Sequence, residues 1–371
     1  MNHKKVILIA LVALFGLALS ACSISSNSSN NASTEKDSSV FLSIDGGNTW
    51  RVAASLATTG KLQDIRDLNV NTMTMDPQDN LAVYLATLDH GLYYTYNVMT
   101  NGWIKVKDLP EATVRDVKVD PKNKCIIYAA SANRLYRSSD CSRTWSQVYF
   151  DNEAAVTVNT VVVDFYNTNN VYIGTSRGEI IKSIDGGASW RTIQRLNEGI
   201  SQLIISPLDS RLIFVGTVKN NIYSFTTNSE TNAADSANID KNFAVVNWND
   251  LNTVLKDYKI GNSFKDFVVS EADGKMFIAT NQTILRSADN GITWEQIKLI
   301  QPDKSATVNA LAVNPKNSNE LYYVTNTTFF SSTDGGATWT TKKLPTTRAG
   351  RDLLVDFSNP KNIYLGTIKL K

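Results

Sequence analysis

The octapeptide "STDGGATW" (332–339) indicates a repeat architecture, because close copies of it recur along the chain. The copies are "SIDGGNTW" (43–50), "SIDGGASW" (183–190), "SADNGITW" (287–294) and the looser "SSDCSRTW" (138–145). An acidic residue beside two glycines could form a metal loop, a phosphate-binding loop or a catalytic centre. It could also form a tight turn that one fold uses several times.

A second repeated signature, a hydrophobic run that ends in a polar residue, gives the period of the chain. The aligned polar residues are 76, 120, 164, 206, 270, 314 and 356, so successive copies lie 42 to 44 residues apart, with one longer step of 64. Each unit holds four short runs rich in β-branched and aromatic residues and bounded by turn formers, which is typical of strands. The sequence therefore predicts an all-β, seven-bladed β-propeller of four-stranded antiparallel blades.

The two ends of the chain complement each other. The last unit stops at "IYLGTIKLK" (363–371) without a box, whereas "VFLSIDGGNTW" (40–50) is a box without its first two strands. We expect the N-terminal strands to complete the last blade and close the ring, which removes exposed sheet edges. The propeller is predicted over residues 40–371. Its fourth unit carries a polar loop insertion at about 226–247, and a short helix is expected after it.

The N-terminal segment has the pattern of an export signal. A basic start is followed by an apolar run, and "LSAC" (19–22) resembles the bacterial lipoprotein signal box, which implies cleavage before Cys22 and a lipid on its thiol. We therefore predict a signal peptide (1–21), a disordered Ser/Asn-rich tether (22–39) and an extracytoplasmic bacterial lipoprotein that touches the membrane only through its anchor. The alternative is an ordinary signal peptide with a chance cysteine.

The two remaining cysteines, Cys125 and Cys141, lie on either side of a tight turn between two expected strands. Antiparallel pairing across that turn makes the thiols cross-strand neighbours, and export permits a disulfide. We predict a Cys125–Cys141 disulfide, with two buried free thiols as the alternative.

Each box is interpreted as a structural hairpin between the third and fourth strands. It supplies one carboxylate, whereas a calcium loop gathers several oxygen ligands and a P-loop needs a lysine and a following helix. The aspartate should accept bonds from its own turn, and the tryptophan should bury its ring against the next sheet. These predicted structural residues are Asp45, Trp50, Asp140, Trp145, Asp185, Trp190, Asp289, Trp294, Asp334 and Trp339.

The S-x-D-x-G-x-T-W pattern is identified as the Asp-box, or bacterial neuraminidase repeat, and the resemblance covers residues 40–371. The family includes sialidases, sortilin-type receptor ectodomains, xyloglucan hydrolases and the photosystem II assembly factor, in which the box is a structural turn outside the active centre. The chain lacks the R-I-P motif of sialidases, and its seven predicted blades differ from the six-bladed propeller that the sialidase resemblance implies. Its single propeller also differs from the paired propellers of xyloglucan hydrolases. The resemblance therefore implies the fold more strongly than any activity.

Composition argues against several classes of function. The net charge of +2 comes from Lys4 and Lys5, so nothing supports nucleic-acid binding. Outside the signal, His90 is the one histidine, and its turn context "LDHGLYY" suggests a solvated residue. We predict no catalytic residue, no metal and no cofactor. Paired carboxylates for glycoside chemistry stay open, because sequence does not give their separation.

A candidate binding ring comes from the residues five positions before the aligned polar residues, where the first strand of each blade starts. All seven are polar: Asn71, Arg115, Asn159, Ser201, Lys265, Asn309 and Arg351. An aspartate directly follows each basic member. In one interpretation the channel entrance is polar because it is solvated, and each arginine is paired with its neighbours. In the other, the three cations converge on an acidic peptide, a C-terminal carboxylate or an anionic glycan.

The function predicted from the sequence is that of a monomeric, lipid-anchored scaffold. It would bind a protein or peptide with an acidic or C-terminal carboxylate feature at the polar mouth of the channel. The alternative is a glycan-binding protein or a glycoside hydrolase of sialidase-like or xyloglucan hydrolase-like type.

Overall fold

The computed structural model describes residues 37–58, 63–227, 239–258, 264–280, 283–300 and 307–370. The predicted signal peptide, Cys22 and all but the last three residues of the predicted tether lie outside the described residues, as do residues 228–238 of the insertion. Within the described part, no helix is long and apolar enough to cross a membrane.

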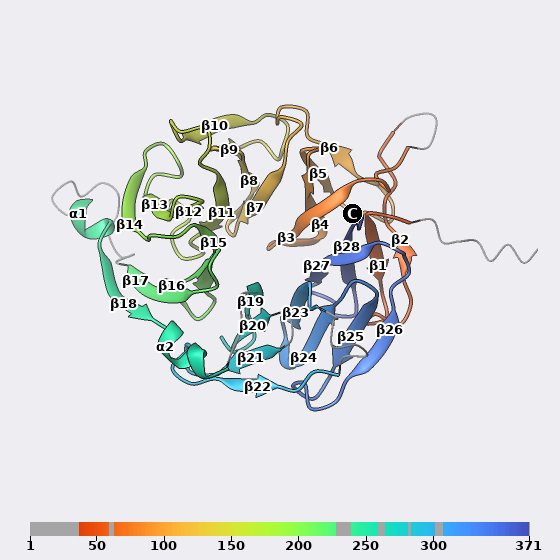
Figure 1. Cartoon of the computed structure of the whole chain (residues 1–371). Helices are drawn as coiled ribbons and strands as arrows, with labels where there is room; N and C mark the ends of the chain where they lie inside the picture. The colour runs from red at the N-terminus through yellow and green to blue at the C-terminus, as the bar shows by residue number, and fades with distance from the viewer. Residues whose placement is uncertain are drawn as a thin grey trace, which may run out of the picture. The chain divides into compact units, whose positions relative to one another are not determined.

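Seven four-stranded antiparallel sheets form the blades of a propeller (Figure 1), which confirms the predicted fold. Blades 1 to 6 follow chain order from β3 to β26, and blade 7 combines β27 and β28 with the N-terminal β1 and β2.

The strands are grouped here by their place in the blade, in order from blade 1 to blade 7. The innermost strands are β3 (Asn69–Asp76), β7 (Val114–Asp120), β11 (Val158–Val163), β15 (Ile200–Ser206), β19 (Phe264–Val269), β23 (Ala310–Asn314) and β27 (Ala349–Val355). The second strands are β4 (Asp79–Leu88), β8 (Asn123–Ser131), β12 (Val171–Thr175), β16 (Asp209–Thr217), β20 (Met276–Thr280), β24 (Asn317–Val324) and β28 (Ile363–Ile368). The third strands are β5 (Leu92–Thr95), β9 (Arg134–Ser138), β13 (Glu179–Ser183), β17 (Ile222–Thr227), β21 (Ile284–Ser287), β25 (Thr328–Ser332) and β1 (Val40–Ser43). The outermost strands are β6 (Ile104–Lys105), β10 (Ser146–Phe150), β14 (Arg191–Arg195), β18 (Val245–Asp250), β22 (Glu295–Ile297), β26 (Thr340–Lys343) and β2 (Arg51–Val52).

The ring is closed by pairing between the two ends of the domain. Strand β1 pairs antiparallel with β28, from Val40 opposite Gly366 to Ser43 opposite Ile363. Figure 1 shows the red-orange N-terminal strands beside the blue C-terminal ones. The complementary ends of the sequence therefore form one blade, as predicted.

The hydrophobic core lies between the blades. Seven clusters of buried side chains each join two consecutive blades, for example Val40 of blade 7 with Val70 and Trp103 of blade 1. The box tryptophans belong to these clusters, but they pack on the preceding blade and not on the next one. The Trp190 indole donates to the Val148 carbonyl of blade 2 at 2.8 Å. The tryptophans differ from the prediction because sheet twist turns the outer strands of each blade toward the preceding blade.

The aligned polar residues that gave the period all cap the turn after the innermost strand. In each blade, the side-chain oxygen of this residue accepts a hydrogen bond from the backbone N–H two positions later. Asp, Asn and Ser favour such turns because their short side chains reach their own backbone. The second signature is therefore a turn requirement that is repeated once per blade.

The boxes form closed hydrogen-bonded turns. Asp334 accepts from the Thr338 backbone N–H at 2.9 Å, and also from the Thr338 hydroxyl. The Ser332 hydroxyl donates to Asp334 at 2.8 Å and accepts from the Gly336 N–H at 2.9 Å. The bonds from Thr338 lower the pKa of Asp334 to about 2. The other four boxes repeat this geometry, so their carboxylates are occupied by their own turns.

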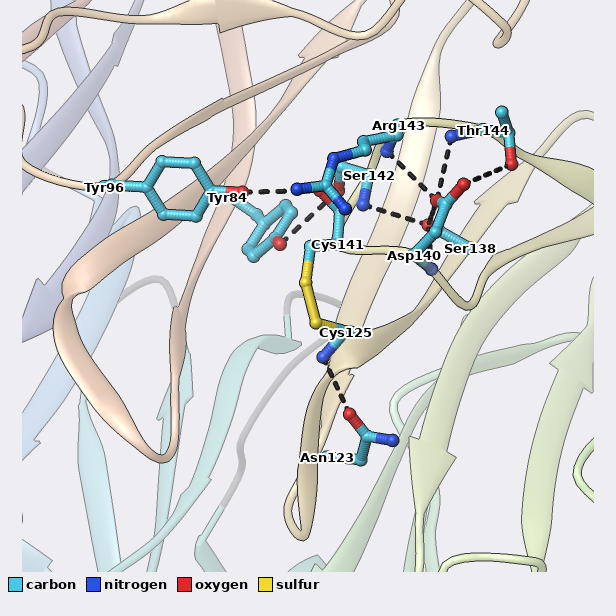
Figure 2. The surroundings of a disulfide bond; sticks show 10 residues. All are labelled: Tyr84, Tyr96, Asn123, Cys125, Ser138, Asp140, Cys141, Ser142, Arg143 and Thr144. Atoms are coloured by element: carbon cyan, nitrogen blue, oxygen red, sulfur yellow. Dashed lines mark hydrogen bonds between the residues drawn. A yellow bond between two sulfur atoms is a disulfide. The ribbon is translucent and has the colours of Figure 1, made fainter.

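A disulfide joins Cys141, in the box of blade 2, to Cys125 in strand β8 (Figure 2), as predicted. In blades 3, 6 and 7, the first box glycine donates its backbone N–H to a carbonyl just before or within the second strand. Cys141 makes the same bond to the Cys125 carbonyl at 3.2 Å. Cys141 and Ser142 also keep the positive φ angles of those glycines, at 59° and 65°, which cost energy for residues with a Cβ. The disulfide thus secures a turn that lacks its usual glycines.

The insertion in blade 4 is not entirely a loop. Its described ends belong to β17, to the short helix α1 (Ile239–Asn242) and to β18. The Asn242 carbonyl accepts a hydrogen bond from the buried Lys182 ammonium of blade 3 at 2.6 Å. The predicted helix after the insertion is present as α2 (Asn252–Leu255), followed by the 3₁₀ helix η2 (Lys256–Tyr258).

The Asp-box geometry predicts the effect of Asp334→Ala. The melting temperature should fall by a few degrees, because the Thr338 donors and the Ser332 hydroxyl lose their acceptor. Thermal denaturation followed by circular dichroism measures this, with Asp108→Ala as a control at an exposed aspartate of the β6–β7 connection. Equal melting of Asp334→Ala and the wild type would contradict a stabilising role.

The disulfide predicts two different outcomes for its replacement. Cys125→Ser with Cys141→Ser should cost about 2–4 kcal/mol of unfolding free energy, because the chain loses a cross-link and keeps a strained turn. Cys125→Asn with Cys141→Gly and Ser142→Gly copies the Asn319, Gly335 and Gly336 arrangement of blade 6 and should recover part of that loss. Urea unfolding compares them, and equal stabilities of the two variants would refute the glycine-substitution argument.

Candidate functional site

The candidate ring residues lie together around one cavity. The cavity has a volume of about 850 Å³, and its lining includes all seven ring positions predicted from the sequence. The innermost strands line it along their length, and Figure 1 shows these strands around the centre of the propeller. The start of each innermost strand therefore contributes one polar residue to one opening of this channel.

The asparagines of the ring are committed to joining blades. The Asn71 amide donates to the Val114 carbonyl at 2.9 Å and the Asn159 amide to the Ile200 carbonyl at 2.7 Å, each on the next blade. The Asn309 amide donates to the Gly350 carbonyl at 3.0 Å in the same way. These bonds satisfy carbonyls on the channel edge of the innermost strands, so the asparagines have a structural role there.

The aspartates that follow the basic ring residues also join blades. Asp116 accepts from the Val161 N–H at 3.0 Å, Asp266 from the Leu311 N–H at 3.1 Å, and Asp352 from the Met73 N–H. Each donor belongs to the next blade. These carboxylates therefore point between the blades and bind backbone, and Asp116 also forms an ion pair with Lys118 at 2.9 Å.

The three basic ring residues are left without acid partners. Arg115, Lys265 and Arg351 are exposed, and within the described residues none of them forms an ion pair. The Arg351 guanidinium donates to the Asn71 side-chain oxygen at 3.0 Å, and the Asn71 amide donates to the Arg115 carbonyl at 3.0 Å. Arg351 and Arg115 thus flank Asn71, and Lys265 lines the same cavity from blade 5.

Ser201 adds an unsatisfied group to the same opening. Its hydroxyl is buried and has no hydrogen-bond partner within the described structure. Buried hydroxyls in proteins are nearly always bonded, so this oxygen is an exception among the ring residues. The sequence predicted that Ser201 belongs to the ring, but only the structure shows that its hydroxyl has no partner.

The first described residue, Asp37, is held by the loop between β26 and β27. The Asp37 carboxylate accepts bonds from the Thr346 hydroxyl at 2.8 Å and from the Thr347 N–H at 2.8 Å. These threonines directly precede strand β27, which starts at the cationic opening. The bonds from Thr347 lower the pKa of Asp37 and keep it charged. Sequence reasoning missed this anchor, because a lone aspartate next to a Ser/Asn-rich segment gives no signal.

Glycoside hydrolysis needs two carboxyl groups near each other, and one such pair is present. Asp151 and Glu179 are buried, and each lies 2.9 Å from the same nitrogen of Arg177. This guanidinium also binds Glu153, so it holds both carboxylates in a salt-bridge network. Neither Asp151 nor Glu179 lines the central cavity. The pair therefore has a structural explanation in this salt-bridge network.

The described residues contain no group of three or more His, Cys, Asp or Glu side chains that could hold a metal. His90 is exposed in a turn, and its ring nitrogen lies 3.1 Å from the Leu88 carbonyl.

Comparisons with known proteins agree with the propeller fold. A protein-family model described as the DUF6242 beta propeller domain matches residues 207–359. No curated protein sequence matches the chain.

Solved structures show the same architecture at low identity. A GH74 enzyme from Niastella koreensis is 17% identical, with a TM-score of 0.62 over 85% of this chain and 52% of its own. The GH74 xyloglucanase from Xanthomonas campestris is 14% identical, with a TM-score of 0.61 over 86% and 52%. The structure of YCF48 bound to a D1 peptide is 15% identical, with a TM-score of 0.57 over 85% of this chain and all of the other. The chain thus spans about half the length of the two GH74 proteins, and identities this low show the fold alone.

The buried aspartates of the channel predict a pH dependence of stability. Burial, with a smaller contribution from the charge of Asp352, raises the pKa of Asp266 to about 7. The folded state therefore holds a proton that the unfolded chain releases near its ordinary pKa of about 4. The stabilisation from this group is complete below pH 4 and is lost as the pH rises through 7, with up to a tenfold change in the folding constant per unit.

Asp266→Asn should flatten this dependence. Urea unfolding between pH 5 and 8 gives the free energy of unfolding of the variant and the wild type. The wild type should lose more stability over this range, and Asp108→Asn serves as the exposed control. Parallel curves for Asp266→Asn and the wild type would overturn the assignment to Asp266.

Proposed function

We propose that the protein is an extracytoplasmic, lipid-anchored scaffold that binds a protein or peptide at the cationic opening of its channel. The observation that carries this proposal is the set of three exposed cations, Arg115, Lys265 and Arg351, around one cavity with no acid partner among the described residues. Fold stability gains little from like charges gathered at one opening, so a ligand explains them better than packing does.

The chemistry of these side chains indicates a carboxylate ligand. Guanidinium groups bind carboxylates through parallel hydrogen bonds, and Arg115 and Arg351 flank the same asparagine. An acidic side chain and a free C-terminus both supply this group. The likeness in fold to YCF48, which was solved with a D1 peptide, is compatible with a peptide ligand for this chain.

The point of chain entry supports the membrane part of the proposal. Asp37 is bonded to the loop before β27, on the face of the propeller where the innermost strands start, and the segment between Cys22 and Asp37 could extend at most about 50 Å. A lipid on Cys22 would then keep this opening within reach of segments that emerge from the same membrane. The proposed partner is therefore membrane-associated.

We do not propose an enzyme. The glycoside hydrolase alternative draws on the fold shared with the GH74 proteins and on the Asp151 and Glu179 pair. Catalysis of that kind needs one carboxyl group free to donate a proton and the other free to attack or activate water. The shared ion pairs with Arg177 argue against both roles.

The triple variant Arg115→Ala, Lys265→Ala and Arg351→Ala tests the binding proposal. It should lose capture of membrane proteins from a detergent extract, and lose binding of a model acidic peptide, with no fall in melting temperature. The control removes three exposed cations from outer strands, Arg51→Ala, Lys342→Ala and Lys343→Ala, and should bind normally. Free and amidated versions of the peptide separate a terminal carboxylate from an acidic side chain. Unchanged binding by the first variant would refute the proposal.

A further inference from the structure

The opposite end of the channel carries a second repeated position. It lies two residues after the aligned polar residue, in the turn between the first two strands of each blade. In blades 1, 2 and 6 this side chain ties its blade to the next one. The Gln78 amide donates to the Asp120 carbonyl at 3.2 Å, the Lys122 ammonium to the Tyr166 carbonyl at 2.6 Å, and the Lys316 ammonium to the Ser358 carbonyl at 2.6 Å.

Blades 3 and 4 replace this polar link with large apolar side chains. The position holds Tyr166, which is 64% exposed, and Leu208, which is 66% exposed. Leu208 reaches blade 5, where a Cβ on Gly274 would lie 2.6 Å from its Cδ1 atom. The Tyr166 ring lies beside the Lys122 ammonium of blade 2, 5.8 Å from the ring centroid to the nitrogen, yet most of its surface stays exposed. Large exposed apolar side chains on two consecutive blades are typical of interaction sites.

The surface continues into the mouth of the channel. Phe165 and Pro207, the neighbours of Tyr166 and Leu208 in the chain, line the central cavity, and Phe165 is 38% exposed. We call Phe165, Tyr166, Pro207 and Leu208 the apolar collar. It spans blades 3 and 4, which are green in Figure 1, and borders blade 5.

One carboxylate accompanies the collar. Glu271 of blade 5 lines the same cavity, is exposed, and forms no hydrogen bond or ion pair within the described residues. Leu208 packs against Gly274, which lies in the same turn as Glu271. An unpaired carboxylate beside apolar surface favours a basic group, because charge complementarity decides which partner docks there.

We propose that the apolar collar and Glu271 form a second docking surface, which takes an extended segment of a partner protein with apolar side chains and one basic side chain. The ligand class differs from that of the cationic opening, which lies at the other ends of the same innermost strands. Glu271 also argues against a surface of anionic lipids, which would repel its charge. The two openings thus differ in their exposed side chains, with unpaired cations at one and the apolar collar with Glu271 at the other.

The test uses a labelled hexapeptide of alternating leucine and tyrosine with one central lysine, and measures its binding to the full chain by fluorescence anisotropy. Two matched peptides carry norleucine or glutamate in place of the lysine. The lysine peptide should bind most tightly and the glutamate peptide least. Equal binding of the lysine and glutamate peptides would overturn the proposal.

Variants locate the binding on the collar. Tyr166→Ser with Leu208→Ser should weaken binding of the lysine peptide at least about tenfold. Glu271→Gln should remove the preference for lysine over norleucine. The matched control is Ile292→Ser, which removes an isoleucine that is 69% exposed in a box hairpin on the same side of the blades and should bind normally. Unchanged binding by the double variant would overturn the proposal.

Two further measurements keep the test decisive. Melting temperatures check folding, and Tyr166→Ser alone, which leaves the contact with Gly274 intact, replaces the double variant if that one melts early. Sedimentation with phosphatidylglycerol vesicles probes a lipid surface. Vesicle binding that disappears with Tyr166→Ser and is insensitive to Glu271→Gln would overturn the peptide assignment in favour of lipid.

Discussion

The pairing of β1 with β28 is the interaction on which the rest of the structure depends. A ring of sheets buries every interface between blades only if the first and last blades meet, and here the meeting is made by strand pairing within one blade. The channel, its two openings and the seven hydrophobic clusters all follow from this closure. An open array would leave an edge strand and one bare hydrophobic face.

The residues at repeated positions fall into two groups. Those of the first group join the blades or close their turns, and those of the second group occupy such a position without making that bond. The turn caps, the box aspartates and the asparagines of the channel make the same bonds in blade after blade. The basic residues Arg115 and Lys265 and the apolar residues Tyr166 and Leu208 occupy repeated positions without making such bonds. Both proposed surfaces rest on that comparison between equivalent positions.

The box of blade 2 shows how the same comparison can point to stability and not to function. Cys141 and Ser142 depart from the glycine pattern, yet the turn keeps its backbone angles and its hydrogen bonds. In the other boxes glycines adopt these angles without strain, whereas here the disulfide to Cys125 constrains the turn. The Tyr96 hydroxyl of blade 1 also donates to the Cys141 carbonyl at 3.3 Å, so this turn supports the neighbouring blade as well.

The sequence alone determined the number of blades, the closure of the ring, the box turns and the seven positions around one opening. These properties follow from periodicity, which a one-dimensional pattern carries in full. Only the tertiary structure decided which polar residues of that ring are already bonded. Asp116, Asp266 and Asp352 stand beside the basic residues in sequence, yet they bind backbone of the next blade, because neighbours along a strand point to opposite faces. The packing of each tryptophan on the preceding blade and the exposure of Tyr166 and Leu208 likewise depend on contacts between blades, which the order of residues does not contain.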